Sequence, residues 1–267
     1  MHYSSSSTLV LLFLALVRNS HQQSWNYYCE AGFCEPGLKN VGCDPPPAGG
    51  GPACSGKQAE SVNFNFVVQA AIVNEHNRLR SLLATGRLGK FAPASRMPQL
   101  VWDTELANQA ERNVRSCVYG HDECRNTAQF RFVGQNIAIV RYSGPRKSVL
   151  ELLHEEIYGW WSEANSTTQA NLRRFPSEEP LSQIGHFTQM VSDRTWKMGC
   201  AAQQWTENKV FNVLYFVCNY SFTNMVGEPV YVAGPPASRC ATGEDKLYPG
   251  LCLKSERIYS TPFAVVN

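Results

Sequence analysis

The sequence predicts an α+β fold in which a sheet lies between two layers of helices, a three-layer α-β-α sandwich. Three segments with helical periodicity alternate with a few strands along the chain, which is the pattern of a sheet covered by helices. The run Phe211–Tyr220 has one polar residue, Asn212, before Cys218, and it is rich in aromatic and β-branched side chains. Such a strand suits burial on both faces, so we place it at the centre of the sheet.

Three helices are predicted from apolar residues that recur every three or four positions. The first begins at Phe66 and ends at Thr85-Gly86. The second begins after Asp103, a favourable N-cap, and ends by Gly120. The third begins at Pro145, because proline is favoured in the first turn of a helix. The buried stripes are Val68, Ile72, Leu79, Leu82 and Leu83, then Leu106, Ala110, Val114 and Cys117, then Val149, Leu153, Ile157, Trp160 and Ala164.

One more strand and a hairpin are predicted from the rest of the chain. Residues 137–142 have the apolar character of a strand. Cys200 and Cys218 flank a polar turn region at 206–209. Pairing the two flanking strands as a hairpin brings these cysteines opposite each other. A short polar segment with His186 precedes the hairpin and is assigned no regular structure.

The beginning of the chain and its cysteines predict export. Residues 9–17 form an apolar block that is too short to cross a bilayer but has the length of a signal-peptide core, so we expect a signal peptide at 1–23. The ten cysteines are an even number, as in a secreted protein whose cysteines are all paired. No other apolar stretch is long enough for a membrane span, and we therefore expect a soluble extracellular protein.

The charge balance gives no indication of a nucleic-acid partner. The net charge is +2, and the lysines and arginines are scattered along the chain without a basic run. Hydrophobic residues make up 43% and charged residues 17%, which is ordinary for a globular protein with a well-filled core.

Six short motifs in one order resemble the CAP superfamily, the cysteine-rich secretory, antigen 5 and pathogenesis-related proteins. They are His76-Asn77, Cys117-x-x-Gly120-His121-x-x-Cys124, Gly134-Gln135-Asn136-Ile137, Trp160-x-x-Glu163, Gly185-His186-Phe187-Thr188-Gln189 and Cys218-Asn219-Tyr220. The resemblance predicts a CAP domain at 60–232, a disulfide-rich extension at 24–59 and a tail at 233–267. The extension and the motif at 117–124 are most similar to the insect antigen 5, or venom allergen, branch.

The resemblance to antigen 5 also implies a disulfide pairing. The implied pairs are Cys29 with Cys43, Cys34 with Cys124, Cys54 with Cys117 and Cys200 with Cys218, and Cys240 and Cys252 remain for a fifth pair. Two of these bonds would join the extension to the second helix and the segment that follows it.

A cleft with two histidines and two acidic residues is implied by the same resemblance. The matching positions are His121, Gln135, Glu163 and His186, with glutamine in place of one acid. Two neutral imidazoles with one carboxylate can hold a divalent ion such as zinc. We expect a weak site with His121 and His186 as ligands and with Glu163 and Gln135 lining the cleft. A neutral amide is a poorer ligand and cannot act as a general base. The alternative is a hydrogen-bond network that shapes the cleft and binds an ion only adventitiously.

The sequence offers no clear nucleophile for hydrolysis. Ser192 follows His186 by six residues, but no GxSxG turn is present, and all cysteines are expected to be in disulfides. His76 is expected to be a hydrogen-bonded helix residue. A hydrolase that uses a divalent metal or a histidine with a glutamate is therefore the less favoured alternative.

The preferred function is non-enzymatic binding of a small apolar ligand, a sterol or a fatty acid, or of an extracellular protein, by a monomer. Some CAP proteins bind such lipids, and the resemblance implies this possibility. A second alternative is a secreted interaction protein that acts through its surface loops. The sequon Asn165-Ser166-Thr167 is the predicted glycosylation site, and the second sequon, at Asn219, is expected to remain unmodified because it follows a buried strand.

Overall fold

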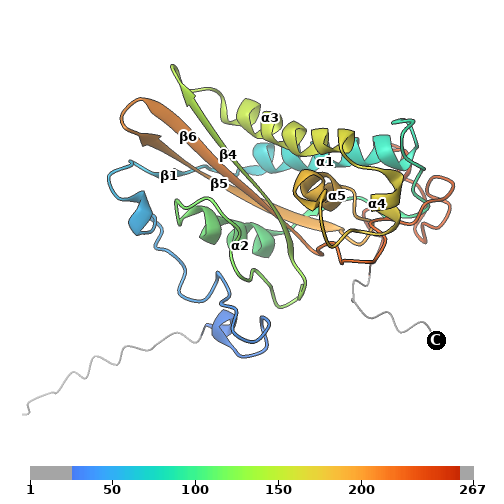
Figure 1. Ribbon diagram of the computed structural model, residues 1–267, viewed down its shortest axis with the longest axis horizontal. Helices are drawn as coiled ribbons and strands as arrows, with labels where there is room; N and C mark the ends of the chain where they lie inside the picture. The colour runs from blue at the N-terminus through green and yellow to red at the C-terminus, as the bar shows by residue number, and fades with distance from the viewer. Residues whose placement is uncertain (1–25, 259–267) are drawn as a thin grey trace, which may run out of the picture.

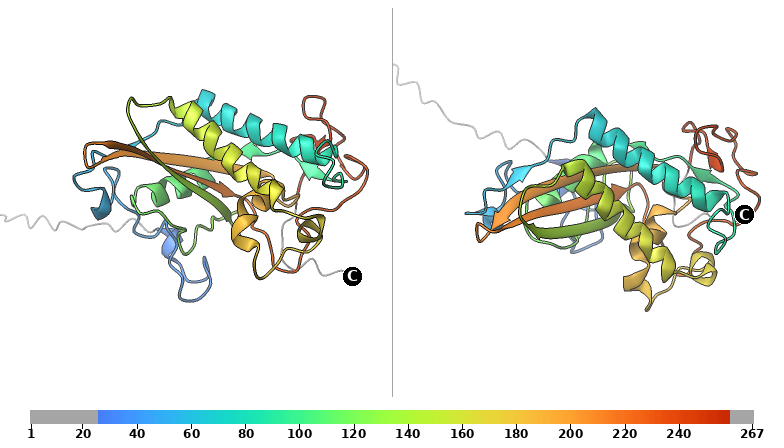
Figure 2. Two further views of the ribbon diagram at one scale, coloured as in Figure 1. Left: turned by 45° about the horizontal axis from the view of Figure 1, so that its top comes forward. Right: turned by 90° about the horizontal axis from the view of Figure 1, so that it is seen from above.

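A computed structural model describes residues 26–258, and in this range a sheet lies between helices on its two faces (Figure 1). Helices α1 (Phe66–Ala84) and α3 (Val149–Ser162) lie side by side over one face, and α2 (Thr104–Val114) covers the other (Figures 1 and 2). The three-layer sandwich predicted from the sequence is confirmed. The predicted signal peptide at 1–23 lies outside the described residues.

The main sheet is antiparallel along its principal path. Its strand order is β1 (Glu60–Ser61), β5 (Lys197–Glu207), β6 (Phe211–Tyr220) and β4 (Gly134–Ser143). A short parallel strand, β3 (Val101–Trp102), pairs with the beginning of β5. Strand β6 is thus flanked on both sides, as predicted from its apolar sequence.

Strand β6 is buried on both faces because alternate side chains enter two different cores. Leu214 and Phe216 pack with α1 and α3, whereas Val213 and Val217 pack with residues of α2. The last eight residues of the strand are buried. This two-sided burial explains why the strand lacks the alternation of polar and apolar residues that a half-exposed strand shows.

The β5–β6 hairpin has the predicted register. Cys200 lies directly opposite Cys218, and the two form a disulfide with a Cα–Cα distance of 4.1 Å. Asn208 and Lys209 at the tip both have positive φ and form the centre of a tight turn that the Val210 N–H closes by donating to Glu207 O, a conformation that matches the twist of the strands.

Three element boundaries differ from the sequence prediction. Helix α2 ends at Val114 instead of near Gly120, because Cys117 adopts a φ of 53° and turns away to form its disulfide with Cys54. Helix α3 begins at Val149, after Ser148, and not at Pro145. The segment with His186 forms a short helix, α5 (Gly185–Met190), whose buried Phe187 and Met190 lie three residues apart on one face.

Short elements complete the described chain. They are the 3₁₀ helices η1 (Tyr27–Cys29), η2 (Pro52–Cys54), η3 (Glu163–Asn165) and η4 (Leu181–Gln183), the helix α4 (Gln169–Arg173), and the strands β2 (Met97–Pro98) and β7 (Leu251–Cys252). Strands β2 and β7 pair in parallel, which attaches the segment after the main sheet to the body of the fold. None of the helices in the described part of the chain is long and apolar enough to cross a membrane.

Arg80 connects α1 to the segment that follows α5. The side chain is fully buried, and its guanidinium donates hydrogen bonds of 2.7 to 3.2 Å to four backbone carbonyls. The acceptors are the carbonyl oxygens of Met190, Ser192, Pro98 and Thr195. Burial lowers the pKa of Arg80 to about 9. These bonds fix the backbone immediately after the helix that carries His186.

Five disulfides join the cysteines of the chain, and they are the five pairs that the resemblance implies. Cys29–Cys43 closes a loop within the first segment. Cys54–Cys117 and Cys34–Cys124 attach this segment to the loop that follows α2. The Pro- and Gly-rich beginning of the described chain is thus ordered by cross-links to the loop that carries His121.

We predict that the double substitution Cys34→Ser/Cys124→Ser lowers the free energy of unfolding by about 2–5 kcal/mol, because it frees a loop that the disulfide restricts in the unfolded chain. The sequence separation is 90 residues for this bond and 12 for Cys240–Cys252. The control Cys240→Ser/Cys252→Ser should therefore lose about 2 kcal/mol less. Chemical denaturation with limited proteolysis measures both, and equal losses, or no early cleavage within residues 26–59, would contradict the prediction.

Candidate functional site

Three of the four predicted site residues line one open cleft. His121 comes from the loop after α2, Gln135 from the beginning of β4 and His186 from the first turn of α5. The cleft has a volume of about 350 Å³, and Asn136 and Gln189 contribute to its wall. Segments far apart in the sequence thus bring both imidazoles to one depression, as the resemblance implies.

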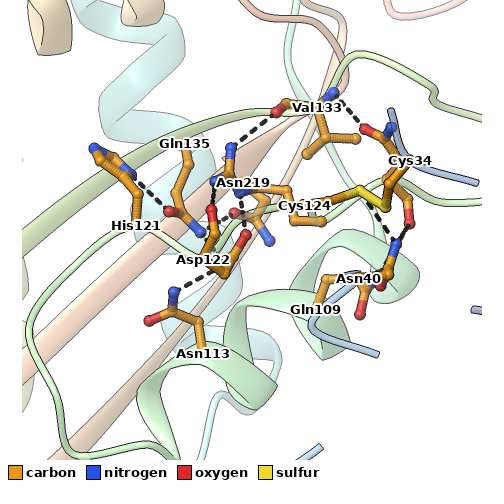
Figure 3. A network of polar contacts seen from close by, with 12 residues as sticks. Cys34, Asn40, Gln109, Asn113, His121, Asp122, Cys124, Val133, Gln135 and Asn219 are labelled. Atoms are coloured by element: carbon orange, nitrogen blue, oxygen red, sulfur yellow. Dashed lines mark hydrogen bonds and ion pairs between the residues drawn. A yellow bond between two sulfur atoms is a disulfide. The ribbon is translucent and has the colours of Figure 1, made fainter. Parts of the chain in front are cut away.

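A polar network fixes His121 (Figure 3). Its Nδ1 lies 2.7 Å from Gln135 Oε1, and because an amide oxygen only accepts, the ring nitrogen is the donor. The amide nitrogen of Gln135 donates to Asp122 Oδ2 at 2.9 Å and to Asn219 Oδ1 at 3.0 Å. Asn113 also donates to Asp122 Oδ2, at 2.8 Å. These partners set the orientation of the Gln135 amide, and the amide in turn sets the proton on His121 Nδ1.

The carboxylate of Glu163 orients the second histidine, His186. His186 Nδ1 lies 2.7 Å from Glu163 Oε1, and Glu163 Oε2 accepts the backbone N–H of Phe187 at 3.0 Å. The imidazole stacks on Trp160, with the ring centres 5.9 Å apart. Glu163 was expected to line the cleft, but it is not among the residues that do so, because both its oxygens face α5. It orients the imidazole, as a carboxylate commonly does for a metal-binding histidine.

Partial desolvation of the ring within the cleft lowers the pKa of His121, although the residue keeps more than a third of its surface exposed. The hydrogen bond to Gln135 acts in the opposite direction and does not offset burial, while the positive charge of Arg125 lowers the pKa further. His121 is therefore neutral at pH 7, protonated on Nδ1, and its Nε2 carries a lone pair. This is the form of imidazole that binds a metal ion.

The donor set of the cleft fits only a weak metal site. Within residues 26–258 no hydrogen bond involves Nε2 of His121 or of His186, so both atoms are available as ligands. No group of three His, Cys, Asp or Glu ligand atoms gathers there; in the described chain such a group occurs at Cys29, Cys43 and Asp44. That group lacks thiolates because its cysteines form a disulfide. Two imidazoles with water are a smaller set than structural or catalytic zinc sites use.

No serine or cysteine of the described chain is placed to act with these imidazoles. Ser192 is buried, with 2% of its surface exposed. Ser182 lines the cleft, but its hydroxyl donates to Glu179 at 2.7 Å. All cysteines are in disulfides. His76 is buried and hydrogen-bonded through both ring nitrogens, to Ile72 O and the Tyr220 hydroxyl, in agreement with its predicted structural role.

Three residues that position the site were not predicted from the sequence. Asp122 and Asn219 hold Gln135, and Asn113 holds Asp122. Asp122 and Asn219 lie within two of the family motifs, directly after His121 and Cys218. Their positions beside motif residues were the one sequence feature that could have identified them. The two sequons differ in access, since Asn165 is exposed and Asn219 is fully buried.

The chain matches known proteins over most of its length. The model of CAP, the cysteine-rich secretory protein family, matches residues 73–220. Venom allergen-1 of Aedes albopictus is 41% identical over 236 residues, which are 88% of this chain and 91% of that protein. Venom allergen 3 of Solenopsis invicta is 38% identical over 188 residues, 68% of this chain and 78% of that protein.

Solved structures share the fold. The structure of BmVAL-1 has a TM-score of 0.59 at 28% identity, covering 72% of this chain and 96% of that one. The crystal structure of NaASP2 with Zn²⁺ has a TM-score of 0.58 at 25% identity, covering 70% of this chain and 96% of that one. Zinc is thus present with one protein of similar fold.

We predict that His121 titrates with a pKa below 6.5, its ordinary value, because burial disfavours the imidazolium. As its folded-state pKa is depressed, protonation opposes folding when the pH falls below 6.5. Gln135→Glu places a carboxylate beside Nδ1 and should raise the pKa above that of the unmodified protein. Titration of the His121 ring resonances by NMR measures both values, and an equal or lower pKa in the variant would contradict the account.

Proposed function

The chain belongs to the CAP family of cysteine-rich secretory proteins, and on this basis we propose that it is an extracellular, non-enzymatic binding protein for a small apolar ligand, a sterol or a fatty acid. The family and the five disulfides indicate an extracellular protein. The proposal extends to a monomer with a signal peptide at 1–23, an extension at 24–59, a CAP domain at 60–232 and a tail at 233–267. It includes a glycan on the exposed Asn165.

The observation that carries the proposal is an apolar cavity between α1, β3 and the segment at 245–254. Its volume is about 450 Å³, within the range of small-molecule sites. The apolar part of its lining is Phe66, Ala70, Val73, Leu100, Val101, Trp102, Leu247 and Tyr248. Phe66 is 81% exposed and Leu247 is 76% exposed, so two large apolar side chains flank the opening in contact with water. Apolar surface gathered around a cavity is typical of a ligand site.

The polar groups of this cavity favour an anionic head group on an apolar body. Lys254 is the one cation among the described residues that line the cavity. The carboxylate of Asp245 is already occupied, since its Oδ1 accepts the backbone N–H groups of Leu247 at 2.8 Å and Tyr248 at 2.9 Å. The carboxylate of a fatty acid would pair with Lys254 in place of the longer-range attraction between Lys254 and Asp245. A sterol would use the apolar lining alone.

The chemistry of the histidine cleft supports binding more than hydrolysis. Gln135 cannot take a proton, and Glu163 already accepts hydrogen bonds from His186 and from the backbone of Phe187. Within the described chain no nucleophile contacts either imidazole. A divalent ion such as zinc would be held by the Nε2 atoms of His121 and His186, and bound there it would supply a Lewis acid and a coordinated water.

Replacing the two exposed apolar side chains at the cavity tests the function. We expect Phe66→Ala/Leu247→Ala to weaken the binding of a fluorescent fatty acid by about tenfold or more, because apolar contact area is lost. Both residues are exposed, so the fold should be kept. The control Val67→Ala/Val118→Ala removes exposed apolar groups outside the cavity and should leave binding unchanged.

The same assay identifies the ligand class. Lys254→Gln should weaken a fatty acid but not a fluorescent sterol, since only the acid carries a charge. Native mass spectrometry of the secreted protein shows whether a lipid co-purifies. Absence of any lipid, together with no uptake of either probe, would overturn the proposed function.

Zinc uptake tests the second site. His121→Ala and His186→Ala should each abolish measurable binding in equilibrium dialysis, because two ligands are the minimum available. Glu163→Gln should weaken binding by about 10–100-fold through loss of the carboxylate that orients His186. His154→Ala, a change at an exposed histidine outside the cleft, is the control. If the His121→Ala and His186→Ala proteins bind zinc as well as the unmodified protein, the cleft is only a hydrogen-bond network.

A further inference from the structure

A third depression lies apart from both sites, between the loop before β4, the beginning of β5 and residues 254–258. Its volume is about 810 Å³, against about 350 Å³ for the histidine cleft and about 450 Å³ for the apolar cavity. It shares no residue with the histidine cleft, and it shares only Lys254 with the apolar cavity. We call it the aromatic groove.

Four aromatic rings line the aromatic groove. Phe130 meets Trp196 edge to face, with the ring centres 6.0 Å apart, and Phe132 lies 6.2 Å from Phe222. The two pairs come from the loop before β4 and from segments next to β5 and β6, so the sheet and that loop hold the aromatic surface in place. Such a preformed surface suits apolar or aromatic groups of a partner.

Cations surround these rings. Arg131, Lys254 and Arg257 line the groove and are exposed, and Lys197 Nζ lies 5.3 Å from the Trp196 ring centre. None of the four forms an ion pair with another of the described residues. Four cations near one groove are a concentration that the scattered basic residues of the sequence did not suggest. Lys254 is also attracted by the charge of Asp245, and the Arg131 guanidinium lies 4.0 Å from the Phe33 ring centre.

The one acidic residue that lines the groove does not neutralise these cations. Glu256 is buried and forms an ion pair with Arg96, at 2.6 Å between Oε1 and Nε. Its other oxygen accepts the backbone N–H and the hydroxyl of Thr242. These contacts hold the wall at 254–258 in place. The groove is therefore rigid on this side and positively charged at its rim.

We propose that the aromatic groove binds an extended acidic segment of another extracellular protein. Its carboxylates would pair with Arg131, Lys197 and Arg257, and its aromatic or aliphatic side chains would lie on Phe132 and Trp196, the two partly exposed rings, which pack on the buried Phe222 and Phe130. A sulfated glycan offers the charge but not the apolar side chains, and a neutral lipid offers no charge. Part of the groove, from residue 221 onward, lies beyond the region matched by the family model.

Electrostatic complementarity at an exposed rim acts strongly on association and is screened by salt. Binding should therefore weaken as the ionic strength rises, in contrast to the capture of an apolar ligand. The two activities can be separated because Arg131 and Arg257 line only the groove, whereas Phe66 and Leu247 line only the apolar cavity.

The test uses fluorescence anisotropy of a fluorescein-labelled peptide of alternating glutamate and phenylalanine. Arg131→Glu/Arg257→Glu should raise its Kd at least about tenfold, and affinity should fall between about 0.05 and 0.3 M sodium chloride. The control Arg87→Glu/Arg173→Glu makes the same charge change at exposed arginines outside the groove and should shift the Kd less than about twofold.

Two further arms decide between partners. A peptide of alternating glutamate and serine should bind at least about fivefold more weakly, because it lacks side chains for the rings. The Phe66→Ala/Leu247→Ala protein should bind the first peptide normally, which keeps this proposal independent of lipid capture. Equal binding of the two peptides, equal binding by the charge-reversed protein, or tighter binding of a heparin oligosaccharide that displaces the peptide would overturn the proposal.

Discussion

The geometry of the histidine cleft depends on the hydrogen bonds that the carboxylate of Asp122 accepts. The loop after α2 has no regular structure between Val114 and β4, so local hydrogen bonding cannot place His121. Asp122 accepts hydrogen bonds from Asn113 of α2 and Gln135 of β4, and it pairs with Arg125 in its own loop. Disulfides at Cys117 and Cys124 hold the same loop on either side of His121. The extension before α1 therefore helps to position the cleft, because it contributes Cys34 and Cys54, the partners in these two disulfides.

The two imidazoles of the cleft are held in different ways, and this asymmetry shapes what the cleft can do. His186 has a carboxylate at its Nδ1, whereas His121 has a neutral amide. The carboxylate orients the His186 ring, while desolvation beside a neutral amide favours the neutral form of His121. The arrangement suits coordination by two lone pairs better than proton transfer, because the amide cannot relay a proton and no described nucleophile contacts either ring. The apolar cavity and the aromatic groove share no residue with the histidine cleft, and they share only Lys254 with each other.

Much of the fold could be predicted because its signals are local. The apolar run of β6 and the periodicity of α1 need no knowledge of distant residues, and both elements have the predicted bounds. The end of α2 could not be found in this way. Cys117 adopts a positive φ to form its disulfide with Cys54, a residue far away in the sequence. The positions of the site residues were predicted from the family resemblance. The roles of Glu163 and Asp122 depend on hydrogen bonds to His186 and Gln135, which are 23 and 13 residues away in the sequence. The periodicity of apolar residues gives no information about such contacts. The aromatic groove was missed for the same reason.

The tautomer of His121 tests the central claim most directly, since it reports whether Asp122 and Asn219 fix the amide of Gln135. Long-range ¹H–¹⁵N correlation spectra of the folded protein at neutral pH identify which ring nitrogen carries the proton. The account predicts a neutral ring protonated on Nδ1, with Nε2 free. A ring protonated on Nε2, or one that exchanges between both forms, would show that the network does not control the cleft.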